Sequence, residues 1–152
     1  MHNIEKEIFD LKSSLLKMFL LVEKQWKKGA NAILNYDQDI AEEISSSENR
    51  INAQELKIDS DCENIIALHA PVAVDLRFIL STYKINHALE HIADIAESIA
   101  QYVANNNVPY DQKILQETRL TEMFDIFNIM MDSLIEAFEN EDPKFARKVF
   151  KK

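Results

Sequence analysis

Hydrophobic residues recur every three or four positions along most of this chain, the spacing that places side chains on one face of an α-helix. A first run extends from about Ile4 to Leu34. Its apolar positions are Ile8, Leu11, Leu15, Met18, Leu21 and Val22. A second run starts after Asp37, an N-cap candidate in a short break at residues 35–37, and ends near His69. The pattern therefore predicts two long helices joined by a tight turn.

A third helix is predicted after Pro71. This proline disfavours helix at Ala70 and can itself open the next element. Apolar residues then follow a heptad-like seam from Ile85 to Val103, which is typical of a helix that packs against neighbouring helices. The sequence Asn-Asn-Asn-Val-Pro at 105–109 is the clearest loop and ends this element.

A fourth helix is expected from about Asp111 to Asn140. Asp142 followed by Pro143 has the form of an N-cap with proline at the first helical position, so a fifth helix should begin there. The chain has a single glycine and lacks strand-like alternation between turn pairs such as Asn-Gly. These features predict an all-α fold.

An internal repeat relates the first predicted helix to the fourth. A shift of 105 residues lays Leu15, Met18, Phe19, Ala32, Asn35, Asp37 and Ala41 onto Leu120, Met123, Phe124, Ala137, Asn140, Asp142 and Ala146. Amphipathic helices match easily at apolar positions, but the shared Asn and Asp at the helix break are harder to obtain by chance. We therefore predict an antiparallel three-helix bundle over residues 1–105. Residues 106–152 would form the first helix, and the start of the next, of an incomplete second repeat.

Composition excludes several classes of function. The formal charge of −9 disfavours nucleic-acid binding, which relies on clustered Lys and Arg. No apolar run approaches the roughly 20 residues that a membrane-spanning helix needs, and the first residues lack the basic and apolar blocks of a signal peptide. We expect a cytoplasmic protein that does not span a membrane. Cys62, the only cysteine, falls on an apolar helix face and is expected in the core.

Two acidic pairs, Glu55 with Asp59 and Glu90 with Asp94, carry the most chemical information. Within each pair the carboxylates are four residues apart, so they point the same way from a helix and repel one another. Glu55 lies only about 40° from Ile51 on the helical wheel, within an apolar arc. A buried carboxylate needs a partner, which a lysine, an arginine or a metal ion can supply.

The pair on the third helix occupies a different environment on the helical wheel. Glu90 and Asp94 are turned about 140° to 180° from the apolar seam, which predicts solvated side chains. His87, His91 and Asn86 share this polar face. Neither histidine belongs to a recognised motif, so each is expected to be a surface residue, although a neighbouring imidazole would favour iron, zinc or nickel over harder ions.

Catalysis has little support in the sequence. Carboxylate enzymes built on helical bundles use Glu-x-x-His, whereas Glu55 is followed at three residues by Ile58 and Glu90 by Ala93. We expect no enzymatic activity and assign no catalytic residue. Two alternatives stay open, a carboxylate-bridged metalloenzyme with inward-facing acidic residues and an enclosed pocket, and a helical interaction module without metal.

Three sequence segments resemble the PhoU family of phosphate-signalling regulators. The segments are Ala70-Pro71-Val72-Ala73-Val74-Asp75-Leu76-Arg77, then Lys84-Ile85-Asn86, then Leu89-Glu90-His91-Ile92-Ala93-Asp94-Ile95-Ala96. The family carries a Pro-x-Ala-x-Asp-Leu-Arg element followed by Glu-x-x-x-Asp on the same helix. The regions around Met18 and Gln25, and residues 55–59, fit the family as well. Its members are built from two three-helix repeats.

The resemblance implies a metal site and protein partners. Glu55, Asp59, Glu90 and Asp94 fall where family members bind surface metal clusters, reported as iron, zinc or other divalent ions. His91 stands where the family commonly has Arg, which makes it an additional candidate ligand. His87 and Asp75 are weaker candidates.

The expected function follows from the same resemblance. It is negative regulation of phosphate uptake and phosphate-starvation signalling, exerted through a phosphate ABC transporter and a phosphate-sensing histidine kinase. A bundle that lacks its second half would also favour a homodimer.

Overall fold

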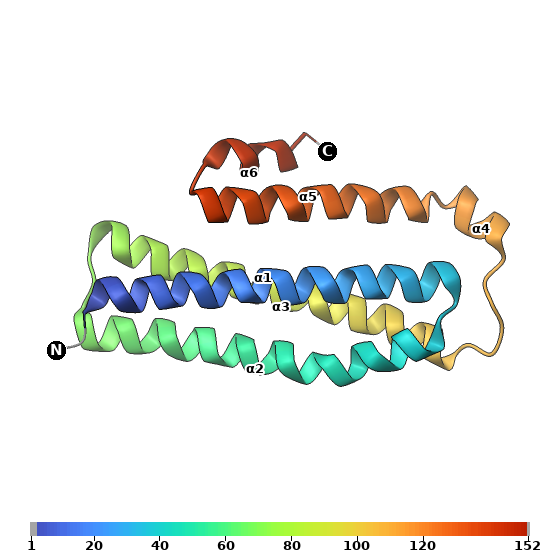
Figure 1. The fold of residues 1–152 in the computed structure, drawn as a ribbon, viewed down its shortest axis with the longest axis horizontal. Coiled ribbons are helices and arrows are strands. Elements are labelled where there is room, and N and C mark those ends of the chain that lie inside the picture. Colours follow the sequence, from blue (N-terminus) through green and yellow to red (C-terminus); the bar gives the residue numbers. More distant parts are fainter. Residues whose placement is uncertain (1–2, 152) are drawn as a thin grey trace.

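The computed structural model describes residues 3–151, and this part of the chain forms six helices and no strand (Figure 1). In order, they are α1 (Ile4–Asn35), α2 (Gln38–His69), α3 (Ala73–Asn105), α4 (Gln112–Glu117), α5 (Leu120–Asn140) and α6 (Pro143–Val149). The predicted all-α fold is confirmed. The first three helices agree with the sequence prediction to within one or two residues at each end.

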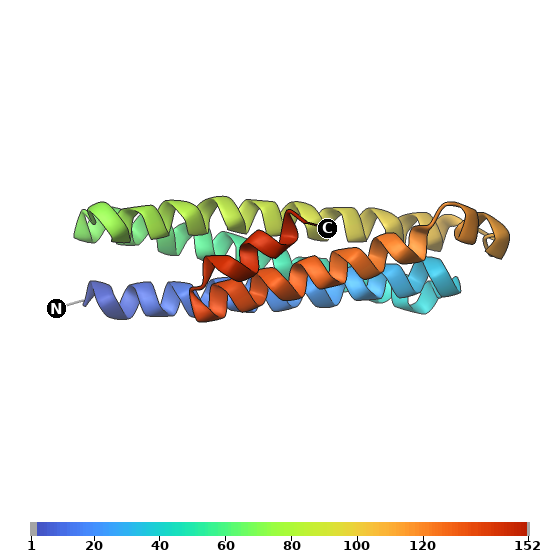
Figure 2. The same ribbon diagram turned by 90° about the horizontal axis from the view of Figure 1, so that it is seen from above.

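The helices α1, α2 and α3 form an antiparallel bundle, with α3 packed along both α1 and α2 (Figures 1 and 2). The main core lies between them. Its buried members include Leu11, Leu15, Met18, Val22, Ile51, Ile58, Cys62, Ile65, Ile79, Leu89 and Ala93. Cys62 is 2% exposed, as predicted, and burial raises the pKa of its thiol to about 12, so the group stays protonated near neutral pH.

The 105-residue repeat aligns the break between α1 and α2 with the break between α5 and α6. These two breaks have the same local geometry. Tyr36 after α1 and Glu141 after α5 both adopt the left-handed conformation, with φ of 51° and 53°. The next residue in each case, Asp37 or Asp142, donates its N–H to a carbonyl near the end of the preceding helix. Each aspartate side chain then caps the following helix. The two breaks therefore share their local geometry, and the duplication itself stays a prediction.

The predicted fourth helix is wrong at one point, because residues 111–140 form two helices instead of one. Arg119 adopts the left-handed conformation, with φ of 54°, and separates α4 from α5. The Thr118 hydroxyl donates to the carbonyls of Ile114 and Leu115 and thereby competes with continued helix. Neither glycine nor proline marks this break in the sequence.

The helix α5 lies alongside α1 on the side opposite α2, and α6 folds back over it (Figures 1 and 2). Aromatic residues make this contact. Trp26 of α1 packs against Phe124 and Phe127, with ring centroids 5.5 and 4.0 Å apart, and Phe19 packs against Phe138. Burial of these apolar side chains therefore holds α5 against the bundle of α1, α2 and α3.

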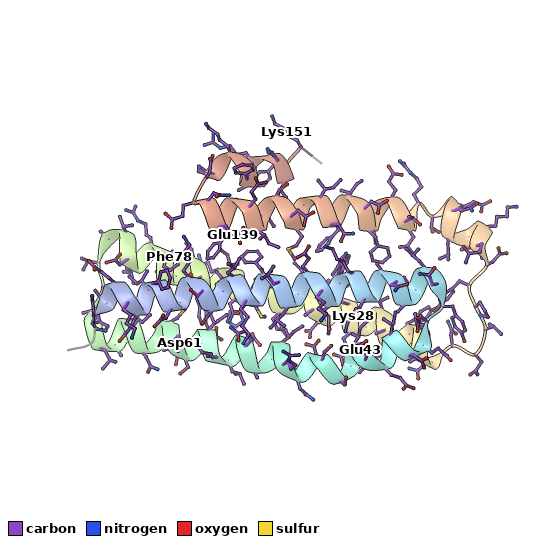
Figure 3. The ribbon with its side chains drawn as sticks, viewed as in Figure 1. Lys28, Glu43, Asp61, Phe78, Glu139 and Lys151 are labelled. Carbon is purple, nitrogen blue, oxygen red and sulfur yellow. The ribbon has the colours of Figure 1, made fainter. Side chains whose placement is uncertain are left out.

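Charged side chains cover the outer surface of the bundle (Figure 3). Lys28 of α1 forms an ion pair with Glu43 of α2 near their connection. Exposed pairs of this kind contribute about 0 to 1 kcal/mol each, so they are a minor part of stability. None of the helices within residues 3–151 combines the length and the apolar composition required to cross a lipid bilayer.

Candidate metal site

Acidic residues of α2 and α3 face one another in two groups along the contact between these helices. Glu55 and Asp59 of α2 meet His87 of α3, and we call this group the histidine cluster. Glu48 of α2 meets Asp94 and Glu97 of α3, and we call this group the carboxylate cluster. Within each cluster, one potential ligand atom per residue lies within 4.8 Å of the others. The antiparallel packing of α2 and α3 produces both groups.

In the histidine cluster, one imidazole ring bridges two carboxylates. His87 Nδ1 lies 3.1 Å from Glu55 Oε1, and Nε2 lies 3.3 Å from Asp59 Oδ2. Both contacts are hydrogen bonds only if both ring nitrogens carry a proton, which makes the ring a cation. A protonated His87 can therefore supply the counter-charge that Glu55 requires. His87 lies at the surface as predicted, with 45% of its side chain exposed, and its contacts with two carboxylates were not predicted.

Asn86 supports the histidine cluster from the core. Its side chain is completely buried, and Nδ2 donates to Asp59 Oδ1 (2.9 Å) and to the Glu55 carbonyl (3.0 Å). Asn86 Oδ1 has no hydrogen-bond partner among the described residues. The prediction that Asn86 lies on a polar face is wrong. The helix α3 packs against both α1 and α2, so two of its faces are buried, and Asn86 lies on one of them.

The carboxylate cluster is centred on a buried glutamate. Glu48 is 5% exposed, and its Oε2 accepts a hydrogen bond of 2.7 Å from Gln25 Nε2 of α1. Its Oε1 is also buried, without a hydrogen-bond partner within residues 3–151. Burial, followed by the negative charges of Glu97, Asp94 and Glu90, raises the pKa of Glu48 to about 7.

Glu90 lies between the two clusters and interacts with both. Burial raises its pKa, and the charges of Asp94 and Glu55 raise it further. The predicted solvation of this pair is correct for Asp94, which is exposed, and wrong for Glu90, which is half-buried. The reason is that Glu90 points along the contact with α2, whereas a helical wheel of α3 alone contains no information about α2.

The structure therefore divides the four carboxylates that the sequence placed in one site. Glu55 and Asp59 belong to the histidine cluster, and Asp94 belongs to the carboxylate cluster. His91 is exposed and joins neither cluster, although its charge lowers the pKa of Glu90 in part. Glu48 and Glu97 were missed, yet each lies seven residues from a predicted ligand on the same helix, the spacing that returns a side chain to the same face.

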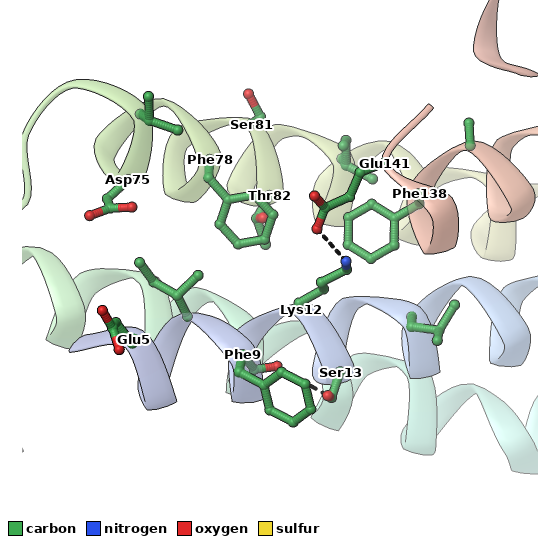
Figure 4. Close-up of a pocket in the computed structure, with 15 residues that line it drawn as sticks. Glu5, Phe9, Lys12, Ser13, Asp75, Phe78, Ser81, Thr82, Phe138 and Glu141 are labelled. Carbon is green, nitrogen blue, oxygen red and sulfur yellow. Dashed lines mark hydrogen bonds and ion pairs between the residues drawn. The ribbon is translucent and has the colours of Figure 1, made fainter. Parts of the chain in front are cut away.

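Asp75 is remote from both clusters. It lies in the first turn of α3, fifteen residues before Glu90, which is about 22 Å along a helix axis. The side chain borders a groove between α1, the start of α3 and the end of α5 (Figure 4). Phe9, Phe78 and Phe138 line this groove, and an ion pair between Lys12 and Glu141 crosses it. The prediction of Asp75 as a weaker candidate ligand of this site is therefore wrong.

The donor atoms present suit metal ions. The histidine cluster offers carboxylate oxygens and an imidazole nitrogen, a set that zinc and iron accept. The unpartnered oxygen of Asn86 and the unpartnered Oε1 of Glu48 are buried polar atoms that a bound ion or its water ligands would satisfy. The arrangement of side chains therefore fits a metal.

Comparison with known proteins identifies similar chains and structures. Residues 15–103 match the family model described as the PhoU domain. A phosphate-specific transport system accessory protein PhoU homolog of Aquifex aeolicus is 30% identical over 97% of this chain. A homolog of Pseudomonas aeruginosa with the same description is 39% identical over 62% of this chain.

Two solved structures share the fold. The crystal structure of PhoU from Pseudomonas aeruginosa superimposes with a TM-score of 0.84 and 29% identity, covering 96% of this chain and 69% of that one. The phosphate transport system regulatory protein PhoU from Streptococcus pneumoniae gives a TM-score of 0.83 at 26% identity, over 97% and 68% of the two chains. This chain spans 66% of the Aquifex aeolicus relative and 39% of the Pseudomonas aeruginosa relative.

Proposed function

This chain belongs to the PhoU family, and from that premise we propose that it is a metal-binding, non-enzymatic regulator that restrains phosphate uptake and phosphate-starvation signalling. Several relatives are named as accessory proteins of phosphate-specific transport systems, which supports a role beside a transporter. The observation that carries the metal-binding part is the histidine cluster, where two carboxylates and an imidazole from two helices converge.

The proposed ligands of the first ion are Glu55, Asp59 and His87, with Glu90 adjoining them. A metal bound there supplies positive charge and cross-links α2 to α3. The neutral imidazole of His87 offers one lone pair to a metal, and the contacts of the ring with the two carboxylates hold it in place. Asn86 keeps Asp59 oriented by a hydrogen bond from inside the core.

The proposed partners are a phosphate ABC transporter and a phosphate-sensing histidine kinase, reached in the cytoplasm. The metal would reduce the negative charge on the surface of α2 and α3, and this surface charge would affect binding of the two partners. We also propose a homodimer, supported by apolar side chains that stay exposed on the later helices, among them Met123, Ile129 and Phe150. Burial of such residues between two copies is favourable.

Metal content tests the first part of this proposal. Glu55→Gln with Asp59→Asn removes two negative charges from the histidine cluster. Glu42→Gln with Glu63→Gln removes the same charge from exposed positions of α2 and is the matched control. After incubation with Zn²⁺ or Fe²⁺ and gel filtration, elemental analysis should find the ion in the wild type and the control, and at least about tenfold weaker binding in the first variant. A wild type without metal would contradict the proposal and favour the metal-free interaction module.

Phosphate uptake tests the regulatory part. The chain is expressed in a bacterial strain that lacks its own PhoU, and phosphate uptake and a phosphate-starvation reporter are measured. The wild type should lower both signals, and the Glu55→Gln, Asp59→Asn variant should lower them less than the Glu42→Gln, Glu63→Gln control. Unchanged signals in the presence of folded wild-type protein would contradict a regulatory role for this chain.

A further inference from the structure

The groove between α1, the start of α3 and the end of α5 is lined by apolar side chains (Figure 4). It has a volume of about 780 Å³, and Phe9, Phe78 and Phe138 are among the residues that line it. Two of the lining side chains are largely in solvent, since Phe9 is 67% exposed and Val74 is 69% exposed. Covering these side chains would remove apolar surface from water and would therefore be favourable.

Negative charge borders this groove. Glu5 of α1 and Asp75 of α3 lie at one end of it, and both are exposed (Figure 4). Neither belongs to an ion pair within residues 3–151. At the other end, Glu141 is paired with Lys12. The groove therefore suits a ligand that combines apolar side chains with positive charge.

The last helix, α6, has the complementary chemistry. Residues 143–151 contain four basic residues and no acidic one, in a chain whose formal charge is −9. Lys144, Arg147 and Lys148 fall within about 100° of one another on the helical wheel, and all three are exposed. Phe150, about 60° from Arg147 on the same wheel, is 90% exposed. One side of this segment is therefore both basic and aromatic.

Within one chain, the groove and the basic side of α6 do not meet, although they adjoin at Glu141. This residue lines the groove and adopts the left-handed conformation, with φ of 53°, so the chain reverses there. The helix α6 then runs back over α5, away from the first turns of α1 (Figures 1 and 2). The residues of α6 are not among those that line the groove. The two complementary surfaces are thus free to meet between copies of the chain.

We propose that this groove binds the basic, aromatic side of α6 from a second copy of the chain, and that the two copies exchange the contact reciprocally. Because the groove and α6 adjoin at Glu141, one two-fold axis can place each α6 in the groove of the other copy, which gives a closed dimer. The lengths agree. The groove follows α1 from Glu5 to Leu16, about 17 Å along the helix axis, and residues 143–151 span about 12 Å as a helix.

Each α6 would contribute to this interface in two ways. Phe150 would leave water and pack among the phenylalanines of the groove. Arg147 and Lys148 would lie beside the carboxylates of Glu5 and Asp75, which orients the helix in the groove. This inference deepens the homodimer of the proposed function and rests on it, because it names the two surfaces that meet.

Charge reversal followed by analytical ultracentrifugation tests the inference on the whole chain. The groove variant is Glu5→Lys with Asp75→Lys, and the helix variant is Arg147→Glu with Lys148→Glu. All four positions are exposed, and circular dichroism checks that each variant is folded. The wild type should dimerise, and each variant should do so with a dissociation constant raised at least about tenfold, because like charges then face each other.

Two matched controls reverse the same charges elsewhere. Glu42→Lys with Glu63→Lys is the control for the groove variant, and Lys24→Glu with Arg50→Glu is the control for the helix variant. These positions are exposed on α1 and α2. Both controls should dimerise as the wild type does, because their substitutions lie outside the proposed contact.

An equal mixture of the groove variant and the helix variant gives the sharpest result. In a reciprocal dimer of the two, the reversed α6 meets the reversed groove, and the unchanged α6 meets the unchanged groove. The mixture should therefore form a dimer with a dissociation constant close to that of the wild type, although neither variant does so alone.

The outcomes separate this inference from the proposed function. Wild-type dimerisation by both reversed variants would overturn the interface and leave the homodimer standing, as would a mixture that stays monomeric while the wild type dimerises. A monomeric wild type would overturn both the interface and the homodimer. None of these results affects the proposed metal site, because the groove lies at the other side of α3 from the contact with α2 that forms the histidine cluster.

Discussion

The two clusters lie on the same pair of helices and differ in how their negative charge is compensated. In the histidine cluster, His87 contacts both Glu55 and Asp59 and can itself carry the positive charge. In the carboxylate cluster, Glu48 is buried beside Asp94 and Glu97 with no cation among the described residues. A contact surface that repeats acidic residues every seven positions therefore contains one region where a histidine can balance the charge and one where burial raises the pKa of a glutamate instead.

Added metal should produce the largest effect and should act on the histidine cluster. An ion at 100 times its dissociation constant stabilises a protein by about 2.7 kcal/mol per site. For a chain of this size, each kcal/mol raises Tm by about 2 to 4 °C. Saturation with Zn²⁺ should therefore raise Tm by about 5 to 10 °C, and chelation should reverse the shift. An equal shift in the Glu55→Gln, Asp59→Asn variant would show that the histidine cluster is not responsible.

Replacement of the imidazole should affect only one cluster. His87→Ala removes a ligand from the histidine cluster and should weaken Zn²⁺ binding at least about tenfold, which corresponds to 1.4 kcal/mol. His91→Ala, an exposed histidine of the same helix, is the control and should bind Zn²⁺ as the wild type does. Isothermal titration calorimetry measures all three proteins, and equal Zn²⁺ affinities would remove His87 from the ligand set.

The pH dependence of stability should distinguish the clusters in the absence of metal. The pKa of Glu48 is raised from 4.5 to about 7 in the folded protein, so the folded state binds more protons than the unfolded state between these values. Stability from this group is fully present below about pH 4.5 and is lost as the pH rises through 7. Allowing for solvent screening, we expect a loss of order 1 kcal/mol, or about 2 to 4 °C in Tm.

Thermal melts of the chelated protein at pH 5 and pH 8 measure this loss. Glu48→Gln has no ionisable group at this position, so its Tm should change less between the two pH values than that of the wild type. The exposed Glu63→Gln control should follow the wild type. Parallel pH profiles for all three proteins would show that Glu48 ionises as an ordinary carboxylate.

The smallest expected effect concerns the residue behind the carboxylate cluster. Ser47→Ala removes the hydroxyl that donates to Gln25 and should destabilise the protein by about 0.5 to 1 kcal/mol. Thermal melts measure this loss, and Ser45→Ala, an exposed serine of the same helix, is the control. A Ser47→Ala protein as stable as the control would show that this hydrogen bond does not contribute to stability.

Helix positions were predictable because they depend on local signals. Asp37 and Asp142 are side-chain caps that follow helix ends, and Pro143 opens a helix, so the α1–α2 and α5–α6 boundaries could be found from the sequence. The break at Thr118 could not, because it depends on a hydroxyl that competes for backbone carbonyls at a site without glycine or proline.

The candidate site was predictable only in part, because it depends on how two helices face each other. Glu55 was correctly expected to need a partner, since it lies in an apolar arc of its own helix. Burial of Asn86 and Glu90 was not foreseen, because α3 is central and packs on two helices, whereas a helical wheel describes one seam. Glu48 carried a usable signal, since it stands between Ile44 and Ile51 on a buried face.

The most direct test of a cation site between α2 and α3 is anomalous diffraction from crystals soaked in Zn²⁺ and, separately, in Fe²⁺. We predict a peak between Glu55, Asp59 and His87, in the histidine cluster. Crystals that diffract well and show no peak between α2 and α3 would contradict the account.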